Sequence, residues 1–211
     1  GIMTKMHHCK YRFGLTGTLD GTQTHQLVLE GLFGAAEKVV TTKELIDKNT
    51  LANLKIKCLI LRHPNIREKM TYAEELDYIV TNKKRNDFLL NLLRHLRGNT
   101  LCLFQLVEKH GKVLHERLGS NDNVYFVYGG VDTKERETIR GLVETHTNSV
   151  TIASYGTFST GINIRNIHNI VFASPSKSKI RVLQSIGRGL RTSESKDSVL
   201  IYDIADDISY N

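Results

Sequence analysis

From residue 55 onward, short β-rich runs alternate with stretches of helical character, and this rhythm constrains the fold of the chain most strongly. Six runs are predicted as strands, at residues 56–61, 100–104, 124–128, 150–153, 170–173 and 199–202. Helices are predicted between several of them, at residues 83–97, 107–118, 132–145 and 178–191. Because alternating strands and helices favour a parallel sheet covered on both faces, we predict a doubly wound α/β domain.

The first 54 residues do not continue this rhythm. They contain one short predicted strand at residues 11–15, one predicted helix near residues 25–33, and a polar stretch. A chain of 211 residues has room for one sizeable core and a fragment of a second domain. We therefore predict that residues 1–54 are the tail of a preceding domain with its linker, and that residues 55–211 form the next domain.

The helix predicted at residues 132–145 has a defined start signal. Asp132 is expected to accept a hydrogen bond from the third helical amide, while Glu135 reaches back to the helix start, as in a capping box. We therefore expect a helix that begins directly after Asp132.

Composition narrows the partners and the compartment. The formal net charge of +7 suits a polyanionic partner, although a basic surface also serves solubility alone. Cys9, Cys58 and Cys102 lie too far apart to suggest a metal site, and their odd number excludes a full disulfide framework. The chain has no apolar run of about 18 residues, and its start has no signal-peptide pattern. We expect a cytoplasmic protein with no membrane partner and no metal site of its own.

The sharpest chemical signal lies in the segment Gln184-Ser-Ile-Gly-Arg188-Gly-Leu-Arg191. At about 100° per residue, a helix places Gln184, Arg188 and Arg191 on one side and apolar residues on the other. Arginine stays charged and donates paired hydrogen bonds, so it suits the charge on a transferring phosphoryl group. A solvated basic face is the competing interpretation. Gly187 and Gly189 weigh against it, because each costs a helix about 1 kcal/mol and so indicates close backbone approach or an early helix end.

A second segment, residues 153–163, follows a predicted strand and is rich in small hydroxyl residues and glycine. Ligands bind at the carboxyl ends of parallel strands, and hydroxyls with exposed amides can hold phosphate oxygens without reading bases. Ser154, Thr157 and Thr160 are therefore candidates for phosphate contacts. An ordinary turn has the same composition, but the arginine-bearing helix follows after one further strand, and that order favours a binding segment.

Together these segments resemble conserved motifs of the superfamily 2 helicases. The pattern Gln-x-x-Gly-Arg-x-x-Arg at residues 184–191 resembles motif VI, and residues 153–163 resemble motif V. Residues 14–19 resemble motif III, and Gln105 stands at the place of motif IV. Residues 128–136 resemble a strand-glycine-helix element that touches the nucleic-acid backbone, although a plain capped helix would look similar. The resemblance implies a RecA-like fold of the P-loop NTPase type, the second motor domain of such a helicase.

The resemblance also implies roles for single residues. The catalytic residues, which would stabilise charge on the γ-phosphate of ATP, are Arg188 and Arg191. The residues expected to contact ATP are Gly161, Asn163, Gln184, Arg188 and Arg191. The residues expected to contact nucleic acid are Gly129, Gly130, Arg136, Ser154, Thr157 and Thr160. Coupling between domains is expected from Thr16, Gly17 and Thr18. The family commonly has aspartate where Asn163 stands, which weakens that one assignment.

The sequence contains neither a Gly-Lys-Thr/Ser phosphate loop nor an Asp-Glu pair for magnesium. In such helicases both belong to the first RecA-like domain, so ATP and Mg²⁺ are expected to bind only in the full-length protein, and the isolated chain is expected to be inactive. The nearest resemblance is to phage helicases that remodel branched DNA in repair, recombination and replication-fork processing, which implies DNA as the partner. Two alternatives stay open: another superfamily 2 motor, such as a restriction translocase subunit or a repair helicase, and a stand-alone nucleic-acid-binding module without ATPase activity.

Overall fold

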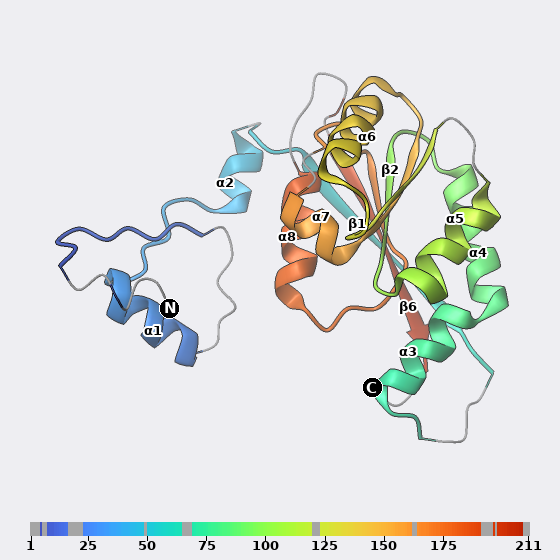
Figure 1. The fold of residues 1–211 in the computed structure, drawn as a ribbon, viewed down its shortest axis with the longest axis horizontal. Helices are drawn as coiled ribbons and strands as arrows, with labels where there is room; N and C mark the ends of the chain where they lie inside the picture. Colours follow the sequence, from blue (N-terminus) through green and yellow to red (C-terminus); the bar gives the residue numbers. More distant parts are fainter. Residues whose placement is uncertain are drawn as a thin grey trace.

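The computed structural model describes residues 5, 8–16, 23–48, 50–64, 69–119, 123–161, 164–190, 196 and 198–208 (Figure 1). Within these ranges, the side chains of residues 23, 42, 159–161 and 179–181 are left undescribed. Four residues with predicted roles lie outside the described part of the chain, namely Gly17, Thr18, Asn163 and Arg191.

Six strands form one sheet, in the order β1-β6-β5-β2-β4-β3. Their bounds are Asn53–Arg62 (β1), Thr100–Phe104 (β2), Val124–Val127 (β3), Val150–Ser154 (β4), Asn169–Phe172 (β5) and Ser198–Asp207 (β6). All the pairings between neighbours are parallel. Each of the six strands predicted from residue 56 onward is present, and the parallel pairing confirms the predicted doubly wound α/β fold.

Helices cover both faces of this sheet (Figure 1). On one face lie α4 (Lys83–His95), the π-helix η2 (Val107–Gly111) and α5 (Lys112–Leu118), with α3 (Tyr72–Thr81) packed beside α4. On the other face lie α6 (Thr133–Thr145), α7 (Tyr155–Gly161) and α8 (Lys179–Gly189). Two further helices, α1 (Gln23–Phe33) and α2 (Thr42–Asp47), precede the sheet.

The central strand β2 shows how the sequence builds both faces at once. Leu101 and Leu103 belong to the apolar cluster under α6, α7 and α8, while Cys102 and Phe104 belong to the cluster under α4 and α5. All four side chains are fully buried. Successive side chains of a strand point to opposite faces, so a strand covered on both sides needs consecutive apolar residues.

Three elements differ from the sequence-based prediction. The helices α2 and α3 were not predicted, although each begins with a capping box, formed by Thr41 with Glu44 and by Thr71 with Glu74. The pattern Thr-x-x-Glu was therefore a usable signal for both. The segment after β4, predicted as a loop, forms the short helix α7.

The start of α6 is confirmed, but its predicted bonding is wrong. Asp132 is the N-cap residue, with extended backbone angles. Its carboxylate accepts from the amide of Thr133 at 2.7 Å, at the first helical residue rather than the third. The bonded amide lies two residues before that of Glu135, so Asp132 caps the helix without the reciprocal pair of a capping box.

Residues 11–16 carry no regular secondary structure, so the strand predicted at residues 11–15 is wrong for this chain. Their apolar side chains are exposed, with Phe13 at 87% and Leu15 at 99% of full exposure. In Figure 1, this segment and α1 lie to one side of the sheet domain, beyond α8. A strand forms only against a neighbour that satisfies its backbone, and this segment pairs with no strand in the described part of the chain.

Candidate functional site

The two segments predicted to bind phosphates, together with the motif IV residue Gln105, lie at the carboxyl ends of adjacent strands. Gly129 and Gly130 follow β3, Ser154 is the last residue of β4, and Gln105 follows β2. Because β4 lies between β2 and β3 and the strands are parallel, these segments emerge side by side at one edge of the sheet. This is the edge at which doubly wound sheets bind their ligands.

Ser154 and Thr157 bond to each other at the start of α7. Their hydroxyl oxygens are 2.8 Å apart, and the Thr157 amide donates to Ser154 Oγ at 3.3 Å. Thr157 is 5% exposed, whereas Ser154 is half-buried. Thr160 and Gly161 lie further along α7, where side chains are not described. Ser154 is therefore the more accessible hydroxyl of the pair, and Thr157 orients it.

Gly129 and Gly130 form an exposed turn after β3, in which the amide of Val131 donates to the carbonyl of Tyr128 at 3.0 Å. A Cβ on Gly130 would lie 2.6 Å from the Tyr128 ring, so a larger residue at this position would have to displace that ring. Arg136 Nε donates to the carbonyl of Val131 at 2.9 Å, and the side chain is half-buried. Arg136 thus braces the turn from the first part of α6.

The helix α8 has a buried side and an outward side. Val182 and Ile186 pack against the apolar cluster under this face of the sheet. Gln184 is exposed and Arg188 is half-buried on the other side, as the helical spacing predicts. Leu183 was expected to face the core, but it is 39% exposed, since it lies at the border between the two sides.

Arg188 lies away from the edge that holds Ser154. The helix α8 starts after β5 at the carboxyl edge and runs back along the sheet. It ends where the carbonyl of Leu190 accepts from the amide of Ala52 at 2.8 Å, directly before β1 begins. The predicted arginine site therefore lies near the amino ends of the strands, and the predicted phosphate-binding segments lie at the carboxyl ends.

Of the two glycines beside Arg188, only Gly189 is explained by close approach. A Cβ on Gly189 would lie 2.4 Å from Ile170 Cδ1, whereas a Cβ on Gly187 would meet nothing within 4 Å. Gly189 is also the last residue of α8, which matches the predicted early helix end. Gly189 therefore shows the predicted close backbone approach, against Ile170 of β5, whereas Gly187 does not.

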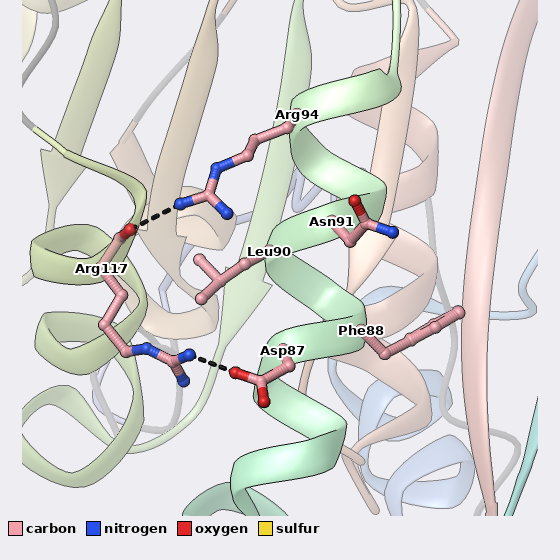
Figure 2. Close-up of a pocket in the computed structure, with 6 residues that line it drawn as sticks. All are labelled: Asp87, Phe88, Leu90, Asn91, Arg94 and Arg117. Carbon is pink, nitrogen blue, oxygen red and sulfur yellow. Dashed lines mark hydrogen bonds and ion pairs between the residues drawn. The ribbon is translucent and has the colours of Figure 1, made fainter.

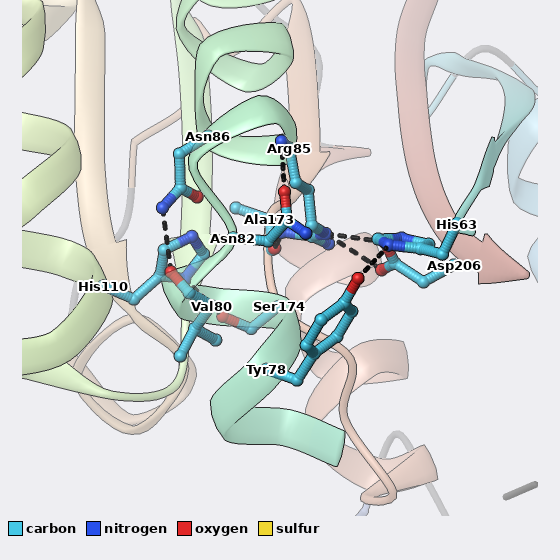
Figure 3. Close-up of polar contacts among 10 residues, drawn as sticks. All are labelled: His63, Tyr78, Val80, Asn82, Arg85, Asn86, His110, Ala173, Ser174 and Asp206. Carbon is cyan, nitrogen blue, oxygen red and sulfur yellow. Dashed lines mark hydrogen bonds and ion pairs between the residues drawn. The ribbon is translucent and has the colours of Figure 1, made fainter. Parts of the chain in front are cut away.

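A buried ionic network at the carboxyl edge carried no sequence signal (Figure 3). Arg85 Nε donates to the Asp206 carboxylate at 2.8 Å, and Arg85 Nη1 donates to the carbonyl of Ala173 at 2.8 Å. His63 Nε2 lies 2.8 Å from the same carboxylate oxygen. The side chains of Arg85 and Asp206 are 1% and 4% exposed. The network ties α4 to the ends of β5 and β6.

Ser174, the second residue after β5, contacts residues of three other segments, of which Figure 3 shows His110. Its Oγ accepts from the amide of Gln105 at 3.3 Å and lies 2.8 Å from His110 Nδ1, while its carbonyl accepts from Tyr155 Oη at 2.8 Å. Burial, aided by Arg85, lowers the pKa of His110 to about 3, so the ring is neutral. A serine beside a histidine can form a nucleophile and base. Here both residues are buried, and the pair instead fixes the connection from β5 to α8.

Lys196 is a further buried polar residue that the sequence did not predict. It is 3% exposed, and its Nζ donates to the carbonyls of Gly189 and Arg165 at 2.5 and 3.0 Å. Burial lowers the pKa of this ammonium to about 8. A lysine in a polar stretch of sequence gives no local sign that it will be buried.

A depression between α4 and α5 contains none of the predicted site residues (Figure 2). Its lining residues are Asp87, Phe88, Leu90, Asn91, Arg94 and Arg117. The two arginines are engaged, since Arg94 donates to the carbonyl of Arg117 at 2.8 Å and Arg117 pairs with Asp87. The depression lies on the face opposite α8, and its arginines are held by surface contacts within the domain.

The described part of the chain holds no group of three or more His, Cys, Asp or Glu residues placed to bind a metal ion. Among the same residues, no helix is long and apolar enough to cross a membrane. Burial raises the pKa of the Cys102 thiol to about 12, so this residue stays protonated within the core.

Comparison with known proteins identifies the family. The model of the helicase conserved C-terminal domain matches residues 84–193, from the start of α4 to just beyond α8. Over 214 aligned positions, the chain is 36% identical to the ATP-dependent DNA helicase UvsW of Enterobacteria phage T4. This chain belongs to the family of helicase C-terminal domains. The alignment covers 97% of this chain and 42% of UvsW, so the chain spans about two fifths of the length of that relative.

Solved structures place the helicase C-terminal domain among RecA-like folds. The crystal structure of T4 UvsW is similar with a TM-score of 0.63 and 37% identity, over 84% of this chain and 35% of that one. Dbp5 of S. cerevisiae, bound to RNA and ADP BeF3, is similar with a TM-score of 0.57 and 15% identity, over 91% of this chain and 44% of that one. The second likeness concerns the fold alone. The domain is the C-terminal RecA-like domain of a superfamily 2 helicase, as its motifs indicate, and lacks a phosphate loop of its own.

Proposed function

We propose that this chain is the C-terminal motor half of an ATP-dependent DNA helicase or translocase that acts on branched DNA. In this proposal, Arg188 and Arg191 stabilise the charge that develops on the γ-phosphate of ATP. Gly161, Asn163 and Gln184 make further contacts to the nucleotide. The triphosphate and Mg²⁺ are held by an upstream RecA-like domain of the same protein.

The observation that carries the nucleotide assignment is the outward side of α8. Gln184 and Arg188 share that side, while the other side of the helix is committed to the core. An arginine on the outward side of its helix can complete an ATP site that another domain begins. Because this chain contains no phosphate-loop sequence, its arginines need a partner domain in order to act on ATP.

The exposed apolar residues near the amino end support an upstream domain. Phe13 and Leu15 are almost fully exposed, and apolar side chains of this size are normally buried. We assign residues 1–54 to the end of that domain and its linker, and residues 55–211 to the second motor domain. Thr16 would then lie beside the cleft, with Gly17 and Thr18, and would couple the two domains.

The carboxyl edge supports the nucleic-acid assignment. Ser154 and the Gly129–Gly130 turn lie at the ends of neighbouring strands, and Arg136 of α6 braces that turn. Amides and hydroxyls of this kind hold phosphates. Thr157 and Thr160 complete the proposed set. The net charge of +7 favours binding to a polyanion. DNA rather than RNA, and branched DNA in particular, is proposed from the similarity to the phage DNA helicase.

The decisive experiment compares ATP hydrolysis by this chain alone with hydrolysis by the protein that includes the upstream domain. Forked, four-way-junction and linear DNA are each tested as activators. We expect hydrolysis only in the longer protein, and stronger stimulation by forks and junctions than by linear duplex. Equal stimulation by linear duplex would favour a translocase of the restriction type. Turnover by the isolated chain would refute the proposed division of the ATP site.

A further inference from the structure

The Lys196 ammonium lies between the end of α8 and the segment at Arg165. It donates to the carbonyl of Gly189, the residue after Arg188, and to the carbonyl of Arg165, shortly after Asn163. One side chain therefore links the end of α8 to the segment that leaves α7. Since the linked atoms belong to the backbone, the link fixes the path of both segments.

Two other contacts fix the end of α8 against the sheet but not against this neighbouring segment. The carbonyl of Leu190 accepts from the amide of Ala52, and Gly189 packs against Ile170 in β5. These contacts set how closely the helix approaches the sheet. Lys196 adds a hydrogen bond from the end of α8 to Arg165, in the segment that follows α7.

A buried lysine at a helix end lowers the stability of the folded protein. Burial disfavours the charged ammonium, and an apolar side chain of similar length would fill the same space without that cost. A cation that donates to the last carbonyls of a helix is nevertheless favourable, because those carbonyls lack helical partners and form the negative end of the helix dipole. Burial of Lys196 thus lowers the stability of the fold, and its hydrogen bonds define the position of the helix end.

We propose that Lys196 is a positioning residue for Arg188, holding the end of α8 in register with the segment at Arg165. This inference rests on the proposed function of Arg188 at the phosphates of ATP. The geometry matters because a displacement of a catalytic group by about 1 Å can cost about 100-fold in rate. Lys196 itself touches neither ligand.

The test is Lys196→Met in the protein that includes the upstream domain. It keeps the apolar part of the side chain and removes both hydrogen bonds. We expect kcat for DNA-stimulated ATP hydrolysis to fall about 10-fold or more, as expected for a misplaced catalytic group, and KM for ATP to change less than about 2-fold, since Arg188 acts in the transition state. Lys196→Arg, which keeps a cationic donor, should retain more turnover than Lys196→Met.

Asn99→Leu is the matched control. Asn99 is 1% exposed, and its amide donates to the carbonyls of Val143 and His146 at 3.0 and 2.7 Å, at the end of α6. Like Lys196, it donates to two backbone carbonyls at a helix end, but α6 carries no arginine that is proposed to act on ATP. Equal loss of kcat in the Lys196 and Asn99 variants would overturn the inference, because it would reflect general destabilisation.

Amide hydrogen exchange in the same proteins, without nucleotide, separates this inference from the proposed function. Lys196→Met should speed exchange at residues 186–190 beyond the change caused by Asn99→Leu, and equal exchange would overturn the positioning role. If the wild-type protein hydrolyses no ATP, the proposed function fails, and the exchange result alone decides whether Lys196 holds the helix end.

Discussion

At the scale of single residues, the proposed function depends most on Arg188. Arg188→Ala in the protein that includes the upstream domain should lower kcat for DNA-stimulated ATP hydrolysis by about 10³-fold, the usual contribution of an arginine at a phosphoryl-transfer site. The same loss is expected for Arg191→Ala. Hydrolysis at saturating ATP and DNA is the measurement, with the melting temperature recorded to exclude unfolding.

Arg117→Ala is the control for this prediction. Arg117 is a partly exposed arginine that pairs with Asp87 on the opposite face of the sheet. Exposed ion pairs contribute at most about 1 kcal/mol, so this variant should keep its turnover. If Arg188→Ala and Arg191→Ala also keep theirs, the arginines do not act on ATP.

The ionic network beneath α4 predicts a large stability effect. Asp206→Ala removes the carboxylate that compensates the almost fully buried Arg85. Leaving a buried charge without its partner costs about 3–5 kcal/mol, so the free energy of unfolding in urea should fall by that amount. Asp77→Ala breaks the exposed pair with Lys109 and should cost under about 1 kcal/mol. Similar losses in both variants would show that Asp206 does not compensate Arg85.

Lys196 predicts a stability trend with pH of known sign. Its pKa is about 8 in the folded protein, and a free lysine titrates near 10.4. Between these values the unfolded chain binds more protons, so the stability contributed by Lys196 rises as pH increases from about 8 to about 10. The free energy of unfolding of the wild type, relative to Lys196→Met, should therefore increase over this range. A flat or falling difference would mean that Lys196 is not buried as a cation.

At the scale of elements, the two glycines of α8 give opposite predictions. Gly189→Ala places a methyl group against Ile170 and should destabilise the protein by about 1–3 kcal/mol, the usual cost of overpacking. Gly187→Ala meets no neighbour within 4 Å and should stabilise the helix by up to about 1 kcal/mol. Thermal unfolding of the two variants checks both signs. If both alanines stabilise the protein, the close approach of α8 to β5 is not rigid.

The elements that the sequence predicts well depend on local pattern. The β-rich runs and the helical spacing of α8 can be read within a window of about ten residues. Thr41 and Thr71 gave capping signals that would have located α2 and α3 as well. The strands and helices that carry the site were thus predicted in their correct order along the chain, while the helical form of α7 depended on tertiary packing of Phe158, which is fully buried.

The buried polar residues could not be predicted in the same way. Arg85 meets Asp206 across 121 positions of sequence, so neither residue carries a local sign of the pair. Lys196 meets Arg165 across 31 positions and lies in a polar stretch. Burial of a charged side chain is decided by which distant carbonyls and carboxylates the fold brings to it. Only the assembled sheet supplies that information.

At the scale of the whole molecule, the charge of +7 predicts weak DNA binding by the isolated chain. Because contacts to phosphates release bound counterions, affinity should fall steeply as salt rises and should not depend on base sequence. Fluorescence anisotropy with two unrelated oligonucleotides at two ionic strengths is the measurement. Binding that survives salt but differs between the oligonucleotides would contradict the assignment of Ser154, Gly129 and Gly130 to phosphate contacts.

The strand order of the sheet has a consequence for synthesis on the ribosome. The first strand, β1, is an edge strand that pairs with β6, the last, through a register from Asn53 with Ser198 to Arg62 with Asp207. Contacts between residues so far apart in sequence form slowly, and a strand without its neighbour is prone to aggregate. In a nascent chain, β1 therefore leaves the ribosome about 145 residues before the strand that shields it. Translation speed across that interval, and chaperones that bind exposed strands, should govern the yield of folded protein.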